Sequence, residues 1–177
     1  MGAGTFKPVK AATMKHHEMH AEWIDANKKF IENLIAQLDK TIIAVGTTSL
    51  RTLESLFWMG VKASINPQIK ELNISQWEVY EEPLLNTCFS TKESLTALLN
   101  WLVNNKQERL FTQSQILIAP GYRFKVANAI ITNFHQPKST LLLLISAFVN
   151  GNWHSIYDYA LENDFRFLSY GDSSLLL

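Results

Sequence analysis

Short apolar runs alternate along this chain with stretches of helical spacing, and this alternation limits the fold more than any other feature. The clearest run, residues 41–45, is followed by a turn at 46–49 and by residues 50–58, whose apolar side chains recur every three or four positions. Such a run has the composition of a buried strand, and the spacing after it is that of an amphipathic helix. The sequence therefore predicts an α/β fold, with helices flanking a mostly parallel sheet and ligands at the carboxyl ends of its strands.

The same patterns place the remaining elements. Further helices are predicted at 16–38, 91–103, 141–149 and 156–163, and further strands at 77–80, 114–119 and 165–167. Ser90 or Thr91 is predicted to cap the second of these helices, and Ser139 or Thr140 the third. Gly60 is predicted to end the helix that begins after the 46–49 turn. A chain of 177 residues suits one domain, so residues 1–177 are treated as a single α/β domain.

Composition excludes several classes of protein. The formal net charge of +0 argues against a general polyanion binder, although residues 101–140 hold five basic side chains and one acidic one and could form a basic face. A single cysteine, Cys88, excludes a disulfide framework or a thiolate zinc site within one chain. The longest apolar run, 141–149, is shorter than the roughly 20 residues that span a bilayer, and the amino-terminal residues have no signal-peptide character. We therefore expect a cytoplasmic protein without a membrane segment.

Residues 132–140, TNFHQPKST, stand directly before the apolar helix predicted at 141–149. A helix start offers unpaired N–H groups and a partial positive charge, so it favours anionic or electron-rich ligands. His135 is the side chain in this motif that can change charge near neutral pH. The alternative is a histidine that serves only as a hydrogen-bonded structural residue.

Residues 42–54 combine a strand, a glycine-hydroxyl turn and a helix start. Backbone N–H groups and hydroxyls there could bind a nucleotide or a carboxylate, and Arg51 could hold a carboxylate with two hydrogen bonds. The segment matches neither the dinucleotide-binding glycine fingerprint nor the lysine-bearing phosphate loop. The alternative is an ordinary capped turn between a strand and a helix.

Two further clusters have chemical potential. His16 and His20 are spaced for one face of a helix, but Ala21 stands where a metalloprotease motif needs histidine, and without a third ligand we expect no metal. His20 or Glu22 could instead act as a general base, or both could lie on a solvated helix face. Near the end of the sequence, Arg166 and Asp172 could bind a ligand or pair with each other.

Together these motifs resemble one known family. The matching segments are GAGTFKPV at 2–9, MHAEW at 19–23, AVGTTSLRTLES at 44–55, PGYRF at 120–124, ITNFHQPKSTLL at 131–142 and RFLSYGD at 166–172. Their order and content are similar to those of the S-adenosylmethionine:tRNA ribosyltransferase-isomerases of queuosine biosynthesis. Family members are about twice this long, and the chain resembles their carboxyl-terminal half. The resemblance implies the larger part of the family's α/β domain, with its β-barrel domain largely missing.

The resemblance also implies a reaction. The ribosyl part of S-adenosylmethionine is moved onto a 7-aminomethyl-7-deazaguanine in the tRNA anticodon, which gives epoxyqueuosine, adenine and methionine. S-adenosylmethionine is then a consumed substrate, tRNA with the precursor base is the partner, and no metal is needed. A full-length member is expected to be a monomer, whereas this chain could self-associate. The alternative is a non-catalytic module that binds nucleotide or tRNA.

Site residues follow by carrying these requirements onto the matching positions. His135 is the first candidate for acid–base work, followed by His20 and Glu22. The groups expected to bind substrate are Thr47, Thr48, Ser49, Arg51, Lys138, Ser139, Thr140, Tyr170 and Asp172. The groups expected to contact tRNA are Arg123, Lys125 and Arg166 on the backbone, with Tyr122 or Tyr170 stacking on a base.

Overall fold

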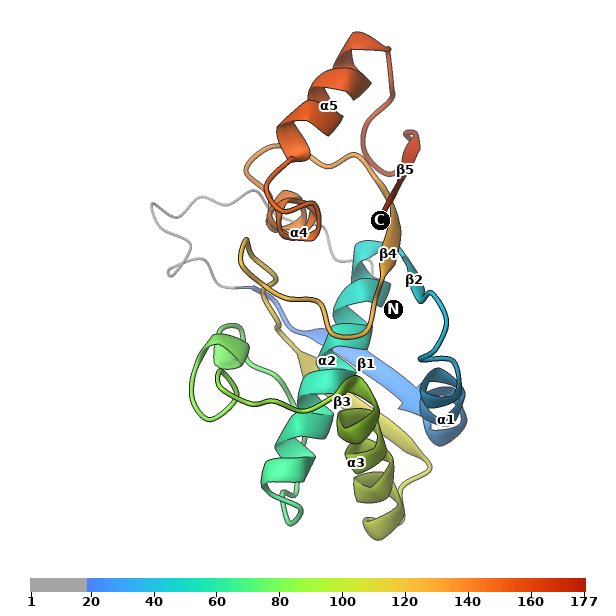
Figure 1. Cartoon of the computed structure of the whole chain (residues 1–177), viewed down its shortest axis with the longest axis vertical. Helices are drawn as coiled ribbons and strands as arrows, with labels where there is room; N and C mark the ends of the chain where they lie inside the picture. The colour runs from blue at the N-terminus through green and yellow to red at the C-terminus, as the bar shows by residue number, and fades with distance from the viewer. Residues whose placement is uncertain (1–18) are drawn as a thin grey trace.

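The computed structural model describes residues 19–177, which form five α-helices and two small sheets (Figure 1). One sheet pairs β1 with β3, and the other has the order β2-β4-β5. The strands are β1 (Glu22–Asn27), β2 (Ile43–Val45), β3 (Arg109–Ser114), β4 (Ala129–Asn133) and β5 (Ser173–Leu176). The helices are α1 (Lys28–Ala36), α2 (Thr47–Ile65), α3 (Thr91–Asn104), α4 (Thr140–Phe148) and α5 (Trp153–Glu162), with a short 3-10 helix, η2, at Glu78–Tyr80.

The predicted α/β class is confirmed, but the predicted strand directions need correction. Strand β2 runs parallel to β4, with Val45 opposite Ile131. Strand β5 runs antiparallel to β4, and β1 runs antiparallel to β3. Of the two described sheets, one is therefore mixed and the other antiparallel, and neither is mostly parallel. The parallel pair arises because α2 carries the chain back along the sheet, as a crossover helix does.

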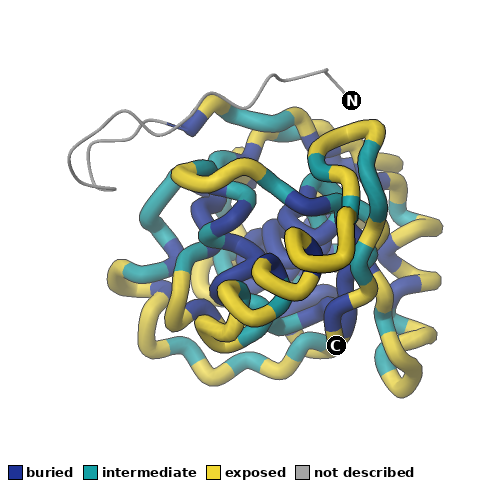
Figure 2. Tube along the Cα trace, turned by 90° about the horizontal axis from the view of Figure 1, so that it is seen from above, coloured by how far each residue is buried: buried dark blue, intermediate teal, exposed yellow. Residues whose placement is uncertain are grey.

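Helix α2 is the central element of the core. It runs through the middle of the molecule, and α3 lies beside it (Figure 1). All residues from Leu50 to Val61 except half-buried Thr52 are buried, so α2 belongs to the buried interior that Figure 2 colours dark blue. A helix that is buried all round can carry polar side chains only where those side chains find partners inside the protein.

Gly60 lies inside α2 and does not end it, so the predicted helix stop is wrong. A Cβ atom built on Gly60 would lie 2.1 Å from the carbonyl oxygen of Ser94 in α3. The residue is glycine because the two helices approach each other closely at this point, and a helix interior does not otherwise favour glycine.

The predicted caps are confirmed where the signal is local. Ser90 accepts a hydrogen bond from the backbone N–H of Glu93, and the Glu93 carboxylate accepts one from the N–H of Ser90, which forms a complete capping box on α3. Ser139 caps α4 by accepting a hydrogen bond from the N–H of Leu142 at 3.2 Å.

Four predicted elements differ in the structure. The described part of the 16–38 helix is strand β1 followed by α1, because Ile24 and Ala26 alternate with exposed residues and pair with β3. The segment predicted as a strand at 77–80 contains η2. A strand was predicted at 114–119, but strand β3 ends at Ser114. Residues 165–167 are not a strand, and the last strand is β5.

Candidate substrate site

Two of the predicted motifs meet at the carboxyl edge of the parallel strand pair. Gly46 follows β2, and its backbone N–H donates to the carbonyl oxygen of Ile131 in β4 at 2.8 Å. Gly46 has a φ of 86°, which a residue with a side chain adopts only with strain. Helix α2 begins at the next residue, Thr47, and no side chain caps it. The first-turn N–H groups of α2 therefore point to the edge where β4 leads into the His135 motif.

A third motif joins the same edge. The backbone N–H of Leu168 donates to the carbonyl oxygen of Phe134 at 2.9 Å, and the Asn133 side chain donates to the carbonyl oxygen of Gly171 at 3.2 Å. These bonds hold the 166–172 loop against the residues that precede His135. The antiparallel β4–β5 pairing causes this arrangement, because the loop comes directly before β5.

His135 is partly buried at this edge. Its Nε2 lies 3.0 Å from the hydroxyl of Thr132, and its backbone N–H donates to the hydroxyl of Tyr157 at 2.9 Å. Burial lowers the pKa of His135 to about 4, so the ring is neutral at pH 7. A neutral imidazole can accept a proton, as a general base must, but this environment makes it a weaker base than a solvated histidine.

The three residues that follow the motif's proline have different surroundings. The Ser139 hydroxyl is occupied by the cap on α4 and donates to the carbonyl oxygen of Gln136 at 2.8 Å. Thr140 is buried, while Lys138 is exposed and has a φ of 57°. Of the three predicted anion contacts, Lys138 is the side chain that reaches solvent at the helix start.

Arg51 already holds a carboxylate within the protein. Its Nη1 lies 2.5 Å from Oε1 of Glu22 in β1, and its Nε donates to the carbonyl oxygen of Ile116 at 3.2 Å. Both side chains of the ion pair are mostly buried, and burial lowers the pKa of Arg51 while Glu22 raises it. Arg51 could bind a substrate carboxylate only if this pair opened, and Glu22 is a poor free base while the pair is closed.

The other residues predicted beside Arg51 and Glu22 vary in exposure. Thr47 is buried, and Thr48 and Ser49 are half-buried at the start of α2. His20 is exposed, and it precedes Glu22 of the ion pair by two residues. His16 lies outside the described residues. Among residues 19–177, no three His, Cys, Asp or Glu side chains form a group suited to a metal ion.

Arg166 and Asp172 pair with each other, which is the second of the two roles that their sequence allowed. Arg166 Nη2 lies 3.2 Å from Asp172 Oδ1, and the Arg166 backbone N–H donates to Oδ2 at 2.8 Å. The hydrogen bond and charge of Asp172 raise the pKa of Arg166, and the hydrogen bonds from Arg166 lower the pKa of Asp172. Arg166 is exposed and Asp172 half-buried, and Tyr170 between them in sequence is 98% exposed, so the loop presents an unpacked aromatic ring.

The predicted stacking role of Tyr122 is wrong for this structure. Tyr122 is buried, its ring packs against those of Tyr80 and Phe124, and its hydroxyl donates to Glu54. It therefore has no free face for a nucleobase. Arg123 is exposed and Lys125 half-buried on the same loop. The loop leads into the amino end of β4, so these two cations lie away from the carboxyl edge that holds His135.

Glu54 is a buried polar residue near the site that the sequence did not single out. It is fully buried in α2 and accepts hydrogen bonds from the loop that contains Tyr122. An acidic residue one turn beyond Arg51, within an otherwise apolar helical stretch, was the available signal. A buried charge of this kind needs partners, and its partners lie about 70 residues away in sequence, where no local pattern could identify them.

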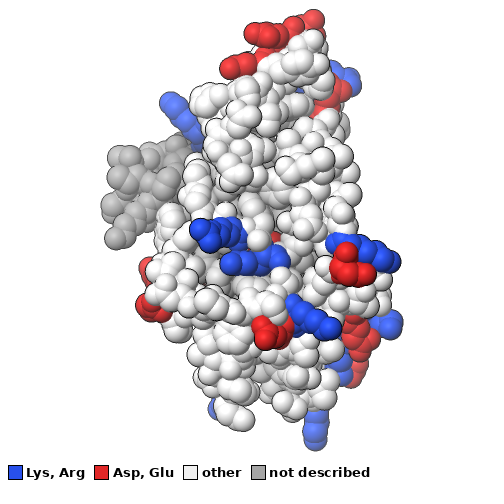
Figure 3. All heavy atoms as spheres, viewed as in Figure 1, with Lys and Arg blue, Asp and Glu red and all other residues white. Residues whose placement is uncertain are grey.

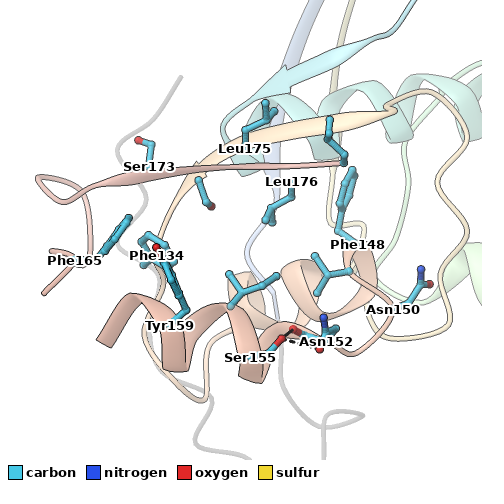
Figure 4. A pocket seen from close by; sticks show the side chains of 14 residues that line it. Phe134, Phe148, Asn150, Asn152, Ser155, Tyr159, Phe165, Ser173, Leu175 and Leu176 are labelled. Atoms are coloured by element: carbon cyan, nitrogen blue, oxygen red, sulfur yellow. Dashed lines mark hydrogen bonds between the residues drawn. The ribbon is translucent and has the colours of Figure 1, made fainter. Parts of the chain in front are cut away.

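A hollow of about 760 Å³ opens between α4, α5 and β5 (Figure 4). Its walls are mainly apolar and aromatic, with side chains of Phe134, Phe148, Tyr159 and Phe165. No predicted site residue lines it. The hollow therefore lies next to the carboxyl edge, through Phe134, without forming part of the predicted site.

Charge is distributed unevenly over the surface. Figure 3 shows basic side chains in the middle of one face and acidic side chains at the end of the molecule that α5 forms in Figure 1. The acidic end contains exposed Asp158, Glu162 and Asp164. A polyanion would therefore be attracted to the middle of this face and repelled from the α5 end. None of the helices within residues 19–177 has the length and apolar character needed to cross a membrane.

Comparison with known proteins identifies relatives along the whole chain. Residues 1–176 match the family model described as queuosine biosynthesis protein. S-adenosylmethionine:tRNA ribosyltransferase-isomerases from Burkholderia cenocepacia (strain HI2424) and Roseobacter denitrificans (strain ATCC 33942 / OCh 114) are 35% and 36% identical to it. These alignments cover 99% and 100% of this chain but 39% and 38% of the relatives, so the chain spans about two fifths of their length.

A solved structure agrees with the sequence relatives. The crystal structure of S-adenosylmethionine tRNA ribosyltransferase from Thermotoga maritima superimposes with a TM-score of 0.55 at 26% sequence identity. The match covers 88% of this chain and 40% of that chain. The family expected from the six motifs is confirmed by the whole-length match: the chain belongs to the queuosine biosynthesis protein family.

Proposed function

We propose that this chain forms part of the active site of an S-adenosylmethionine:tRNA ribosyltransferase-isomerase, as a single α/β domain within residues 1–177. The supporting observation is the meeting of three motifs at one sheet edge, joined by the bonds from Gly46 to Ile131 and from Leu168 to Phe134. A carboxyl edge of parallel strands is where α/β proteins bind ligands. The names of the relatives supply the substrate class, S-adenosylmethionine and tRNA.

The chemistry at this edge follows from the groups present. The first-turn N–H groups of α2, with the hydroxyls of Thr48 and Ser49, suit the methionine carboxylate of S-adenosylmethionine. The sulfonium acidifies the adjacent carbon, and the neutral ring of His135 accepts the proton that this carbon loses. His20 and Glu22 are the second candidates for the base. The proposed proton transfer to a side chain does not involve a metal.

The tRNA contacts are proposed at two places. Lys138 and Arg166 lie on segments at the carboxyl edge, and Arg123 and Lys125 lie on the loop at the other end of β4. Exposed Tyr170 is the ring that remains free to stack on a base. Because tRNA is much larger than this separation, one bound tRNA would reach both places. We place this activity in the cytoplasm, together with the tRNA substrate.

The test is adenine release from S-adenosylmethionine in the presence of tRNA that carries the precursor base. The chain should release adenine, and His135→Ala should lower the rate roughly 10²-fold or more. Lys40→Ala, in the turn after α1, is a control that should leave the rate unchanged. A His135→Ala rate close to that of the parent would remove His135 from the role of base.

The alternative is a module that binds S-adenosylmethionine or tRNA without turnover. The observation that favours it is the share of the relatives that this chain covers, about two fifths. Active sites often lie between domains, so a partial chain can keep a binding surface and lose turnover. Binding by calorimetry without adenine release would support this alternative. If the chain neither binds these substrates nor releases adenine, both proposals are contradicted.

A further inference from the structure

The carboxylate of Glu54 in α2 is surrounded by donors from the 122–127 loop. Oε2 accepts from the Tyr122 hydroxyl at 2.8 Å and from the backbone N–H of Lys125 at 2.9 Å. Oε1 accepts from the N–H groups of Val126 at 2.9 Å and Ala127 at 3.2 Å. Each oxygen therefore receives two hydrogen bonds, and three consecutive backbone groups of the loop are fixed by one side chain.

This arrangement suits an ionised carboxylate. Such a group offers about four acceptor positions, and the four donors occupy them. Burial raises the pKa of Glu54, while the hydrogen bonds from the loop and from Tyr122 oppose that rise. A protonated carboxyl group would have to direct its own O–H toward donors, so the ion fits these surroundings better.

A second set of contacts fixes the side chains of the loop. Trp58 Nε1 donates to the Tyr122 hydroxyl at 2.8 Å, and the Phe124 ring lies 4.7 Å from that of Phe148 in α4. Tyr122, Phe124 and Val126 thus point inward. Arg123 between them is exposed. Lys125 is half-buried, and its ammonium lies 5.7 Å from the ring of buried Trp58.

We propose that Glu54 is a positioning residue for tRNA binding, which holds the 122–127 loop so that Arg123 and Lys125 face the RNA backbone. The inference rests on the proposed function, because it takes these two cations as phosphate contacts. A loop that is ordered before binding loses less conformational entropy when RNA binds. Glu54 therefore raises tRNA affinity without touching tRNA, and it has no part in binding S-adenosylmethionine.

The first experiment tests the anchoring itself. In Glu54→Gln, the amide nitrogen faces two donors and cannot accept from them, so two loop groups lose their partner. Trypsin cleaves after Arg123 and Lys125, and cleavage at these sites in folded protein should become roughly tenfold faster than in the parent. Leu98→Val, a change in the buried part of α3, is the control for general destabilisation and should not expose these sites. Unchanged protection of the loop in Glu54→Gln overturns the proposal.

The second experiment tests the role in tRNA binding by a mutant cycle. Glu54→Gln should weaken binding of tRNA that carries the precursor base by roughly fivefold or more in the parent. In an Arg123→Ala/Lys125→Ala background it should change affinity less than about twofold, because the positioned groups are gone. Affinity for S-adenosylmethionine should stay within about twofold of the parent. Equal losses in both backgrounds would identify a merely structural residue and overturn the proposal.

A milder variant protects the test against misfolding. Tyr122→Phe removes one of the four hydrogen bonds and should shift trypsin protection and tRNA affinity in the same direction by smaller factors. A parent chain that binds no tRNA would overturn this inference together with the tRNA part of the proposed function. If the parent binds tRNA and the Glu54→Gln variant binds it equally tightly, this inference alone is overturned.

Discussion

The imidazole of His135 makes the stability of the fold depend on pH. Its pKa is lowered to about 4 in the folded protein by burial, whereas in an unfolded chain it is about 6.5. Below pH 6.5 the unfolded chain therefore binds a proton that the folded protein does not, and the folded state loses relative stability. This contribution is fully present above pH 6.5 and is lost as the pH falls toward 4.

His135→Asn, which cannot titrate, should flatten the stability profile. The parent should lose roughly 2 to 3 kcal/mol more than this variant between pH 6.5 and pH 4, as measured by urea unfolding at several pH values. The buried and paired carboxylates affect both proteins equally, so the difference isolates His135. Parallel profiles for the two proteins would contradict the assigned burial effect.

At the residue scale, sequence reasoning found the right segments but not the partners of their side chains. Arg51 was expected to hold a substrate carboxylate, and it holds Glu22, which was expected to act as a base. The pair joins α2 to β1, and the two residues are 29 positions apart. Tyr122 was expected to stack on RNA, and its ring is in the core. Residue type predicts the chemistry a side chain can perform, while its partners depend on contacts distant in sequence.

At the scale of elements, the close contact between α2 and α3 depends on Gly60. Gly60→Ala should destabilise the protein by about 2 kcal/mol, because the new methyl group would meet the Ser94 carbonyl oxygen. This loss outweighs the gain of about 1 kcal/mol that alanine brings to a helix interior. Thermal unfolding measures the change.

Asn100→Ala provides the matched comparison for the Gly60 substitution. Asn100 is exposed in α3, so alanine there gains helix propensity without a new contact and should leave stability unchanged or slightly higher. If Gly60→Ala stabilised the protein as much as Asn100→Ala, the helices would be free to separate at this point.

Elements defined by local signals were predicted well, and elements defined by distant pairing were not. The capping box of Ser90 and Glu93 lies within four residues, and α3 was placed almost to its observed ends. Strand β1 was predicted as helix because Met19, Trp23 and Phe30 have helical spacing. It is a strand because β3, more than 80 residues later, supplies its hydrogen-bond partners.

At the scale of the molecule, one face of the β2-β4-β5 sheet carries exposed apolar side chains. Val45, Ile131 and Leu175 lie opposite one another across the three strands. Val45 is 66% and Leu175 55% exposed, whereas the neighbouring row on the other face is buried. Contiguous exposed apolar surface favours association, so we predict that this chain self-associates through this face.

Sedimentation at increasing protein concentration tests this expectation. The parent should form dimers or larger species, and Val45→Lys combined with Leu175→Lys should shift it to monomer with little change in thermal stability. Leu161→Lys is the control, because Leu161 is exposed on α5 away from this row. A parent that remains monomeric at every concentration would count against association through the sheet face.

The backbone of Gly46 has a consequence for how this protein tolerates mutation. Its φ of 86° places it in the left-handed region. The hydrogen bond from its N–H to the carbonyl oxygen of Ile131 fixes the point where α2 begins beside β4. Any side chain there would strain the turn at the meeting place of two motifs. In a saturation scan scored by function, position 46 would therefore be as intolerant as a reacting residue, although glycine carries no group that could take part in chemistry.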